Sequence, residues 1–153
     1  MRSNDFSQML LCENHTAPIS SCWFMPGVSE KFITCSEDST IRLWDSNNYS
    51  VLARCAAPTN QAGVLFPICA VCTDEVIISG WSDGRIRAFR TDNSQLLWQI
   101  ENAHKGGVTA ICLSSNCKFI CSGGMEGDIR VWEIRSRELI SHLKEHNSRV
   151  TKI

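Results

Sequence analysis

A short segment recurs three times in this chain, and its spacing constrains the fold more than any other feature. The copies span residues 36–45, 81–90 and 125–133. When they are aligned on their acidic turn residues, Asp38, Asp83 and Glu126, they lie 45 and 43 residues apart. A fixed period of about 40–45 residues is typical of β-propeller blades. The sequence therefore predicts an all-β chain that forms part of a propeller.

Each repeat reads as four short strands separated by turn residues. The predicted strands are 19–24, 32–36, 40–44 and 51–55 in the first repeat, 67–72, 75–79, 85–89 and 95–100 in the second, and 108–113, 119–122, 128–133 and 138–143 in the third. Asp83-Gly84 favours a tight hairpin between the second and third strands of its repeat. Residues 134–146 could instead form a short helix, but the repeat register favours a strand.

The repeats divide the chain into predicted blades at 15–57, 58–101 and 102–145, of which the second is degenerate. Residues 1–14 are expected to supply an outer strand, at 8–12, to a preceding blade, and residues 146–153 to begin a further blade. Closed propellers contain about 4–8 blades. Since three blades cannot close a ring, we expect these 153 residues to be part of a larger one.

A histidine, a small hydroxyl residue, an acid and an aromatic residue recur at fixed offsets within the repeats. The first repeat has His15, Thr34, Asp38 and Trp44, the third has His104, Ser122, Glu126 and Trp132, and the second has only Ser79, Asp83 and Phe89. A buried indole N–H can donate to the hydroxyl, and an imidazole can link that hydroxyl to the carboxylate. We therefore predict a structural brace, meaning a buried hydrogen-bond chain, in each blade. In the second repeat, which has Asn60 or Gln61 in place of the histidine, apolar packing is expected to replace part of it.

A hydroxyl, a histidine and an acid could alternatively form a catalytic triad, with His15 or His104 as the base. An enzyme needs one active site, however, whereas a blade scaffold needs one brace in every blade, and no Gly-x-Ser-x-Gly nucleophile elbow is present. The pair Cys69 and Cys72 is a weak metal signal, because positions i and i+3 of a strand point to opposite faces. No catalytic residue, metal ligand or cofactor is predicted.

Charge and composition exclude several classes of partner. The net charge of −1 supplies no attraction towards nucleic acid or anionic membranes, and no run of 18 apolar residues is present. Since the N-terminus lacks the apolar core of a signal peptide, a reducing compartment is the default for the nine cysteines. Among those in predicted strands, Cys22, Cys35, Cys112 and Cys121 are expected to pack as small apolar side chains.

Two side chains outside the brace are candidates for partner contact. Trp81 precedes the Asp83-Gly84 turn, where the repeat pattern calls for a small residue. It could pack at a blade edge, or it could be an aromatic anchor for a partner. Met125 lies in the corresponding turn of the third repeat and is a weaker candidate of the same kind. The third-strand arginines Arg85, Arg87 and Arg130 are expected to be solvated or paired across strands.

The histidine, the Ile-Arg-x-Trp-Asp/Glu ending and the period resemble WD40 repeats over almost the whole chain. That resemblance implies a partial WD40 β-propeller of about three four-stranded blades, which acts as a rigid interaction platform and not as an enzyme. Its general form would be an adaptor that binds peptides of a multiprotein complex.

Segments 15–19, 22–30, 77–89 and 102–111 are also similar to the cilia- and flagella-associated WD-repeat proteins of motile axonemes, specifically to the second of their two propellers. This narrower resemblance implies a microtubule inner protein in the cytoplasm, within the cytoskeleton of the cilium or flagellum. Its partners would be tubulin of the doublet microtubule and other axonemal proteins, with no nucleic acid, membrane or small-molecule substrate. It brings no residue-level tubulin site with it.

Overall fold

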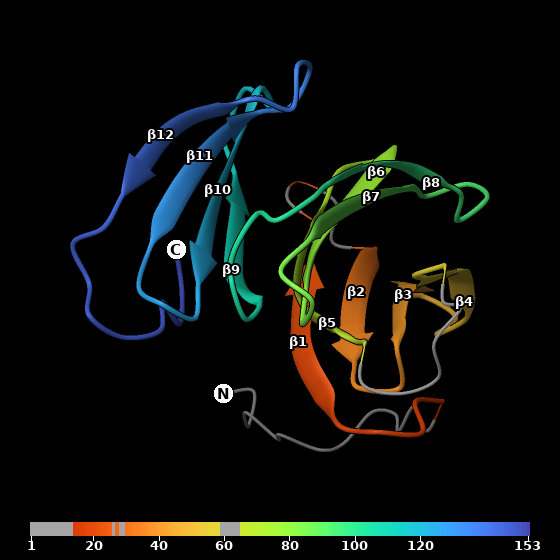
Figure 1. Cartoon of the computed structure of the whole chain (residues 1–153). Helices are drawn as coiled ribbons and strands as arrows, with labels where there is room; N and C mark the ends of the chain where they lie inside the picture. Colours follow the sequence, from red (N-terminus) through yellow and green to blue (C-terminus); the bar gives the residue numbers. More distant parts are fainter. Residues whose placement is uncertain (1–13, 26, 28–29, 59–64) are drawn as a thin grey trace, which may run out of the picture.

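The computed structural model describes residues 14–25, 27, 30–58 and 65–153, which form three antiparallel sheets of four strands each. The strands are β1 (Ile19–Phe24), β2 (Lys31–Ser36), β3 (Thr40–Asp45), β4 (Val51–Ala56), β5 (Pro67–Cys72), β6 (Val76–Trp81), β7 (Ile86–Arg90), β8 (Leu96–Ile100), β9 (Val108–Leu113), β10 (Phe119–Gly124), β11 (Ile129–Glu133) and β12 (Leu139–Leu143). Neighbours in sequence are neighbours in each sheet, so the sheets are meanders that succeed one another as blades 1, 2 and 3 (Figure 1). The described part of the chain contains no helix, and therefore no helical membrane span.

All twelve predicted strands are confirmed, with ends that agree within two residues. The helical alternative for residues 134–146 is wrong, because β12 pairs with β11 and places Leu143 opposite Ile129. The turn between the second and third strands has a positive φ at the same position in every blade, at Ser39, Gly84 and Gly127. The outer strand expected at residues 8–12 lies outside the described residues.

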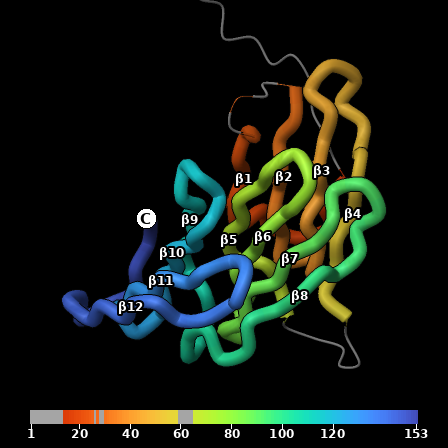
Figure 2. The backbone as a smooth tube through the Cα atoms, turned by 90° about the horizontal axis from the view of Figure 1, so that it is seen from above, coloured from red at the N-terminus to blue at the C-terminus, as the bar shows by residue number. Residues whose placement is uncertain are grey.

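The apolar core lies between blades rather than within them. One cluster joins blades 1 and 2 and includes Ile33, Cys35 and Ile77, while the other joins blades 2 and 3 and includes Ile86 and Ile120. The inner strands β1, β5 and β9 gather near the middle, and the outer strands lie at the periphery (Figure 2). Because alternate strand residues face opposite sides, each blade buries apolar side chains against its neighbours.

Hydroxyl hydrogen bonds tie two of the blades to the next segment of the chain. Each blade has a β-bulge where its inner strand begins, and in two blades the bulged residue carries a hydroxyl. The Ser20 hydroxyl donates to the Pro67 carbonyl at 2.8 Å, and the Thr109 hydroxyl donates to the Val150 carbonyl at 2.6 Å. We call these bonds the interblade clasps.

Residues 146–153 dock on blade 3 in the way that residues 104–111 dock on blade 2. A Cβ added to Gly80 would lie 2.5 Å from Val108, and one added to Gly123 would lie 2.6 Å from Val150, so both glycines admit a close approach. The Val150 amide also donates to the Gly124 carbonyl at 3.1 Å. No strand is assigned to these residues, and the further blade that they were expected to begin stays a prediction.

Replacing Thr109 with valine keeps the shape of the side chain but removes the clasp of blade 3. Because Thr109 is buried and its one hydroxyl proton is shared between the carbonyls of Val150 and Gly123, we expect the free energy of unfolding to fall by about 1–3 kcal/mol. Urea unfolding of the variant measures the loss. Ser20→Ala, at the more exposed clasp of blade 1, should cost less, and a larger loss there would contradict the assignment.

Candidate functional site: the braces and the inner groove

Blade 1 contains the predicted brace with all four members in contact. The Trp44 indole N–H donates to the Thr34 hydroxyl oxygen at 2.9 Å, and that hydroxyl lies 2.6 Å from Nε2 of His15. Nδ1 of His15 lies 2.7 Å from the Asp38 carboxylate. Since Thr34 accepts from the indole, its own proton can go to Nε2, which leaves Nδ1–H to donate to Asp38. This chain of hydrogen bonds runs from a buried tryptophan to a carboxylate at the end of the blade.

Blade 3 contains the same chain of hydrogen bonds, but its acid comes from a different position in the repeat. Trp132 donates to the Ser122 hydroxyl at 2.9 Å, and Nε2 of His104 lies 2.8 Å from the same oxygen. The carboxylate bonded to Nδ1 of His104, at 3.0 Å, belongs to Asp128. The prediction for Glu126 was therefore wrong, because that side chain is exposed and lies 3.5 Å from the Lys105 ammonium group.

The change of acid follows from the local geometry of the turn. Asp128 directly precedes β11, at the position that Thr40 holds in blade 1. In blade 1 the turn residue Asp38 reaches the histidine, and the Thr40 hydroxyl donates to Asp38 at 2.6 Å. In blade 3 the residue that precedes the strand carries the carboxylate itself. A longer acid in the turn, Glu126, is then not required and extends into solvent.

Blade 2 replaces the histidine chain with a tryptophan from another strand. The Trp81 indole, in β6, donates to the Ser79 hydroxyl at 2.8 Å, and that hydroxyl donates to the Arg87 carbonyl at 3.1 Å. Trp81 is 0% exposed, and its ring centroid lies 6.3 Å from that of Phe89. The interpretation of Trp81 as a partner anchor was therefore wrong, and Ser79 keeps an indole donor although Phe89 cannot supply one.

The acid of blade 2 is satisfied by arginine instead of histidine. The two terminal nitrogens of the Arg87 guanidinium donate to Asp83, at 3.0 and 2.6 Å, and the guanidinium carbon lies 5.0 Å from the centroid of the Trp81 ring. Arg87 is only 2% exposed, so the ring contact forms away from water, whereas the Asp83 side chain of the ion pair is 27% exposed. Arg42 and Arg130 also pair with the acid of their own blade, at 3.8 and 2.9 Å.

The braces hold their carboxylates in the ionised form. Burial alone would raise the pKa of Asp38, but hydrogen bonds from Thr40, from His15 and from the Thr16 amide lower it to about 2. The pKa values of Asp83 and Asp128 are also lowered, because their partners outweigh the effect of burial. The pKa of His104 is lowered as well, since burial disfavours its charged form more than Asp128 favours it. His104 is therefore neutral at pH 7.

Because His104 binds a proton less readily in the folded chain than in the unfolded chain, blade 3 should lose stability in mild acid. An unfolded histidine titrates near about pH 6.5, so the contribution is fully present above that pH and is lost progressively below it, by at most about 1.4 kcal/mol per pH unit. Urea unfolding between pH 8 and pH 5 measures the slope. In His104→Gln that part of the slope should be absent, and an unchanged pH profile would contradict the assignment.

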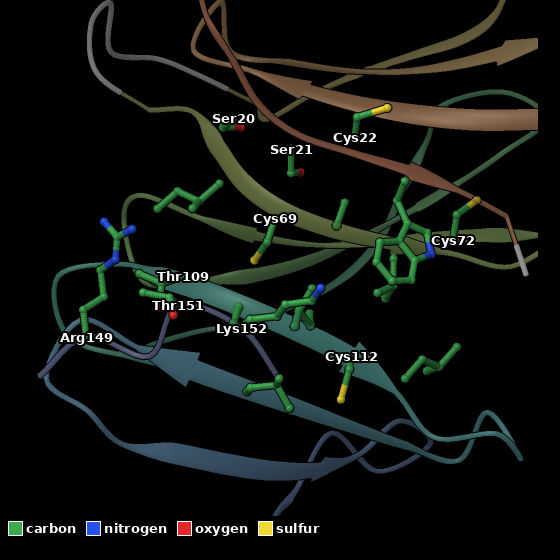
Figure 3. Close-up of a pocket in the computed structure, with 18 residues that line it drawn as sticks. Ser20, Ser21, Cys22, Cys69, Cys72, Thr109, Cys112, Arg149, Thr151 and Lys152 are labelled. Atoms are coloured by element: carbon green, nitrogen blue, oxygen red, sulfur yellow. The ribbon is translucent and has the colours of Figure 1, made fainter. Parts of the chain in front are cut away.

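A groove of about 370 Å³ lies along the inner strands and the C-terminal residues. Its lining includes the thiols of Cys22, Cys69, Cys72 and Cys112 and the cations of Arg149 and Lys152 (Figure 3). Burial raises the pKa of Cys22, and raises those of Cys69 and Cys72 to about 12, so these thiols are protonated and weakly nucleophilic. Among the described residues no group of three histidine, cysteine or acidic side chains could hold a metal ion.

The cysteines differ in how far they pack as apolar side chains. Cys35 is fully buried, as expected. Cys22 is exposed, which contradicts the expectation, and Cys112 and Cys121 are only half-buried. The reason is position, because β1 is exposed along most of its length, and Cys112 and Cys121 lie on the face of blade 3 that points away from blade 2.

Family models match most of the chain. The model described as "WD domain, G-beta repeat" matches residues 6–45, and the model described as "Vps8 beta-propeller" matches residues 50–153. The chain belongs to the WD40-repeat β-propeller family. The brace of blade 2 departs from those of blades 1 and 3 through Trp81, which donates to the hydroxyl in place of a third-strand tryptophan.

Relatives of this WD40-repeat chain carry the name cilia- and flagella-associated protein 52. The human protein is 38% identical over 152 residues, which is 97% of this chain and 24% of that protein. The protein of Chlamydomonas reinhardtii is 37% identical over 141 residues, or 91% of this chain and 22% of that protein. The chain thus spans about a quarter of the length of the relatives it matches.

A solved structure supports the WD40-type fold. The crystal structure of the computationally designed Ika4 protein superposes with a TM-score of 0.75 and covers 95% of this chain and 84% of that one, at 24% sequence identity. At this identity the similarity concerns the fold alone. An all-β propeller segment is therefore shown by the strands, the family models and a solved neighbour together.

Proposed function

We propose that this chain is a non-enzymatic scaffold segment of a microtubule inner protein, located in the axoneme of motile cilia and flagella. In this role it stabilises the doublet microtubule through contacts with tubulin and with other axonemal proteins. The observation that carries the proposal is the 38% identity to human cilia- and flagella-associated protein 52, which extends over 97% of the chain. The aligned region therefore spans all three blades.

The geometry of the braces supports a role without catalysis. In each histidine brace the hydroxyl already bonds to an indole and to an imidazole, and Thr34 and Ser122 are 5% and 0% exposed. A serine or threonine nucleophile must reach its substrate, and these hydroxyls are closed off from solvent. The same arrangement occurs in two blades, which suits a scaffold. We propose that His15 and His104, with their partners, serve the stability of the blades.

Stepwise extraction of axonemes that contain the protein distinguishes a microtubule inner protein from a general WD40 adaptor. We expect the tagged full-length protein, expressed in cells that form motile cilia, to remain with the doublet microtubules through high-salt extraction. It should leave only when detergent opens the doublet wall. A general WD40 adaptor would instead be released with the soluble fraction or with the salt extract, and that result would overturn the proposal.

Met125 is the remaining candidate for partner contact. Its side chain is 43% exposed, in the turn between β10 and β11, where it packs beside Gly106. Met125→Glu should reduce retention on doublets without changing the unfolding midpoint. Leu97→Glu is the matched control, because Leu97 has the same exposed fraction of 43% but lies in the outer strand β8. Equal retention of both variants would exclude the Met125 contact.

A further inference from the structure

Two cysteines of blade 3 face each other directly across neighbouring strands. Cys112 in β9 is the register partner of Cys121 in β10. Directly opposed residues of antiparallel strands have Cα atoms about 4.5 or 5.5 Å apart, and both values lie within the range of about 4.4–6.8 Å that a disulfide spans. Cys112 contributes to the raised pKa of Cys121, which agrees with two thiols that lie close to each other. Backbone movement is therefore not needed to bring them together.

Access separates this pair from three of the other strand thiols, and pairing separates it from Cys22 and Cys69, which also line the groove but lie opposite Thr34 and Gly80. Cys35, Cys55 and Cys72 are 0%, 0% and 3% exposed and lie in the core between blades 1 and 2. Cys112 and Cys121 are half-buried, and Cys112 lines the inner groove, where Figure 3 shows its side chain on β9. A small molecule can therefore reach Cys112 from the groove.

We propose that Cys112 and Cys121 form a reversible, oxidation-dependent disulfide that ties β9 to β10 beside the inner groove. The oxidant is a low-molecular-weight disulfide of the glutathione class. The Cys112 thiolate attacks one sulfur of that disulfide, and a mixed disulfide forms as one small thiol leaves. Cys121 then loses its proton and attacks the Cys112 sulfur, which releases the second small thiol. Two protein thiols are oxidised, one small disulfide is reduced, and both protons end on the released thiols.

The order of attack follows from the surroundings of the two sulfurs. Burial raises the pKa of Cys121 to about 11, and the neighbouring Cys112 adds to this. Cys121 is therefore protonated at neutral pH, and the thiol that faces the groove reacts first. Because only a thiolate attacks, the closing step should become faster as the pH rises.

Mass spectrometry of the whole 153-residue chain, held folded in oxidised glutathione and then alkylated, tests the proposal. The oxidised product should be about 2 Da lighter than the reduced chain before alkylation, because two hydrogens are lost. It should carry two fewer alkyl groups than the nine that its cysteines can accept. Tryptic peptide 106–118 should be joined to peptide 119–130, with the link at Cys112, and dithiothreitol should separate them.

The chain offers a matched control in the same tryptic peptide. Cys117 is exposed and lies in the turn between β9 and β10, so Cys117→Ser should keep the cross-link while Cys112→Ser should lose it. A link that runs through Cys117, a stable glutathione adduct on Cys112 without closure, or nine free thiols after oxidation would each overturn the proposal. The peptide map of the unsubstituted chain decides the matter even where a variant fails to fold.

Discussion

Replacing Trp81 with alanine is expected to lower the free energy of unfolding by about 3–5 kcal/mol. The indole is fully buried between blades 1 and 2, so its removal leaves a cavity lined by Phe89 and the core of blade 1. The Ser79 hydroxyl would also lose its donor, and the Arg87 guanidinium would lose the ring it lies over. Urea unfolding of the 153-residue chain, followed by circular dichroism, measures the loss.

Two controls separate the parts of this effect. Trp81→Phe keeps most of the ring volume and removes only the N–H donor, so it should cost about 1–2 kcal/mol. Trp23→Ala removes an indole of the same size from β1, where the side chain is 47% exposed, and should cost less than about 1 kcal/mol. If Trp81→Ala were as mild as Trp23→Ala, Trp81 would be a surface residue and the brace of blade 2 would be wrongly assigned.

Asp128→Ala is expected to cost about 2–3 kcal/mol, whereas Glu126→Ala should change stability by less than about 0.5 kcal/mol. Asp128 is 6% exposed, accepts from His104 and pairs with Arg130 at 2.9 Å, so its loss leaves a buried imidazole and a partly buried guanidinium without their acid. Glu126 is exposed and contributes only a loose contact to Lys105. The two residues lie in one turn, so the variants form a matched pair.

Thermal unfolding of the two variants beside the parent chain measures the difference. Asp128→Asn adds a test of charge, because an amide can still accept from His104 but cannot pair with Arg130 as an ion. The unfolding temperature of Asp128→Asn should lie between those of the parent chain and of Asp128→Ala. A destabilised Glu126→Ala together with a stable Asp128→Ala would restore Glu126 as the acid of the brace.

Most of the fold could be predicted because its causes are local. The alternation of apolar residues along each strand and the turn residues between strands lie within about ten positions of one another, and a recurring period repeats that pattern. The hydrogen bonds from indole to hydroxyl could also be predicted from the sequence, since Thr34 pairs with Arg42 in the ladder that also carries Trp44. Sequence offsets of this kind are preserved by the antiparallel register.

The altered brace of blade 2 left a trace in the sequence, but each residue taken alone led to a wrong prediction. The repeat lacks its histidine, has Phe89 where the others have tryptophan, and has Trp81 where a small residue is expected. Taken together, three departures in one blade indicate a compensation. Nothing in the sequence distinguishes Arg87, which is 3% exposed at its side chain, from Arg42 and Arg130, whose side chains are 13% and 23% exposed.

The sequence by itself determined the number and order of the strands, the blade period and the residue types of the brace, because these depend on local patterning and on a repeated register. Only the tertiary structure decided which carboxylate accepts from His104, which tryptophan donates to Ser79 and which thiols face one another. Those choices depend on how side chains from segments many residues apart fill one space. Asp128 and Glu126 differ by two positions in sequence, yet only one of them points back into the blade.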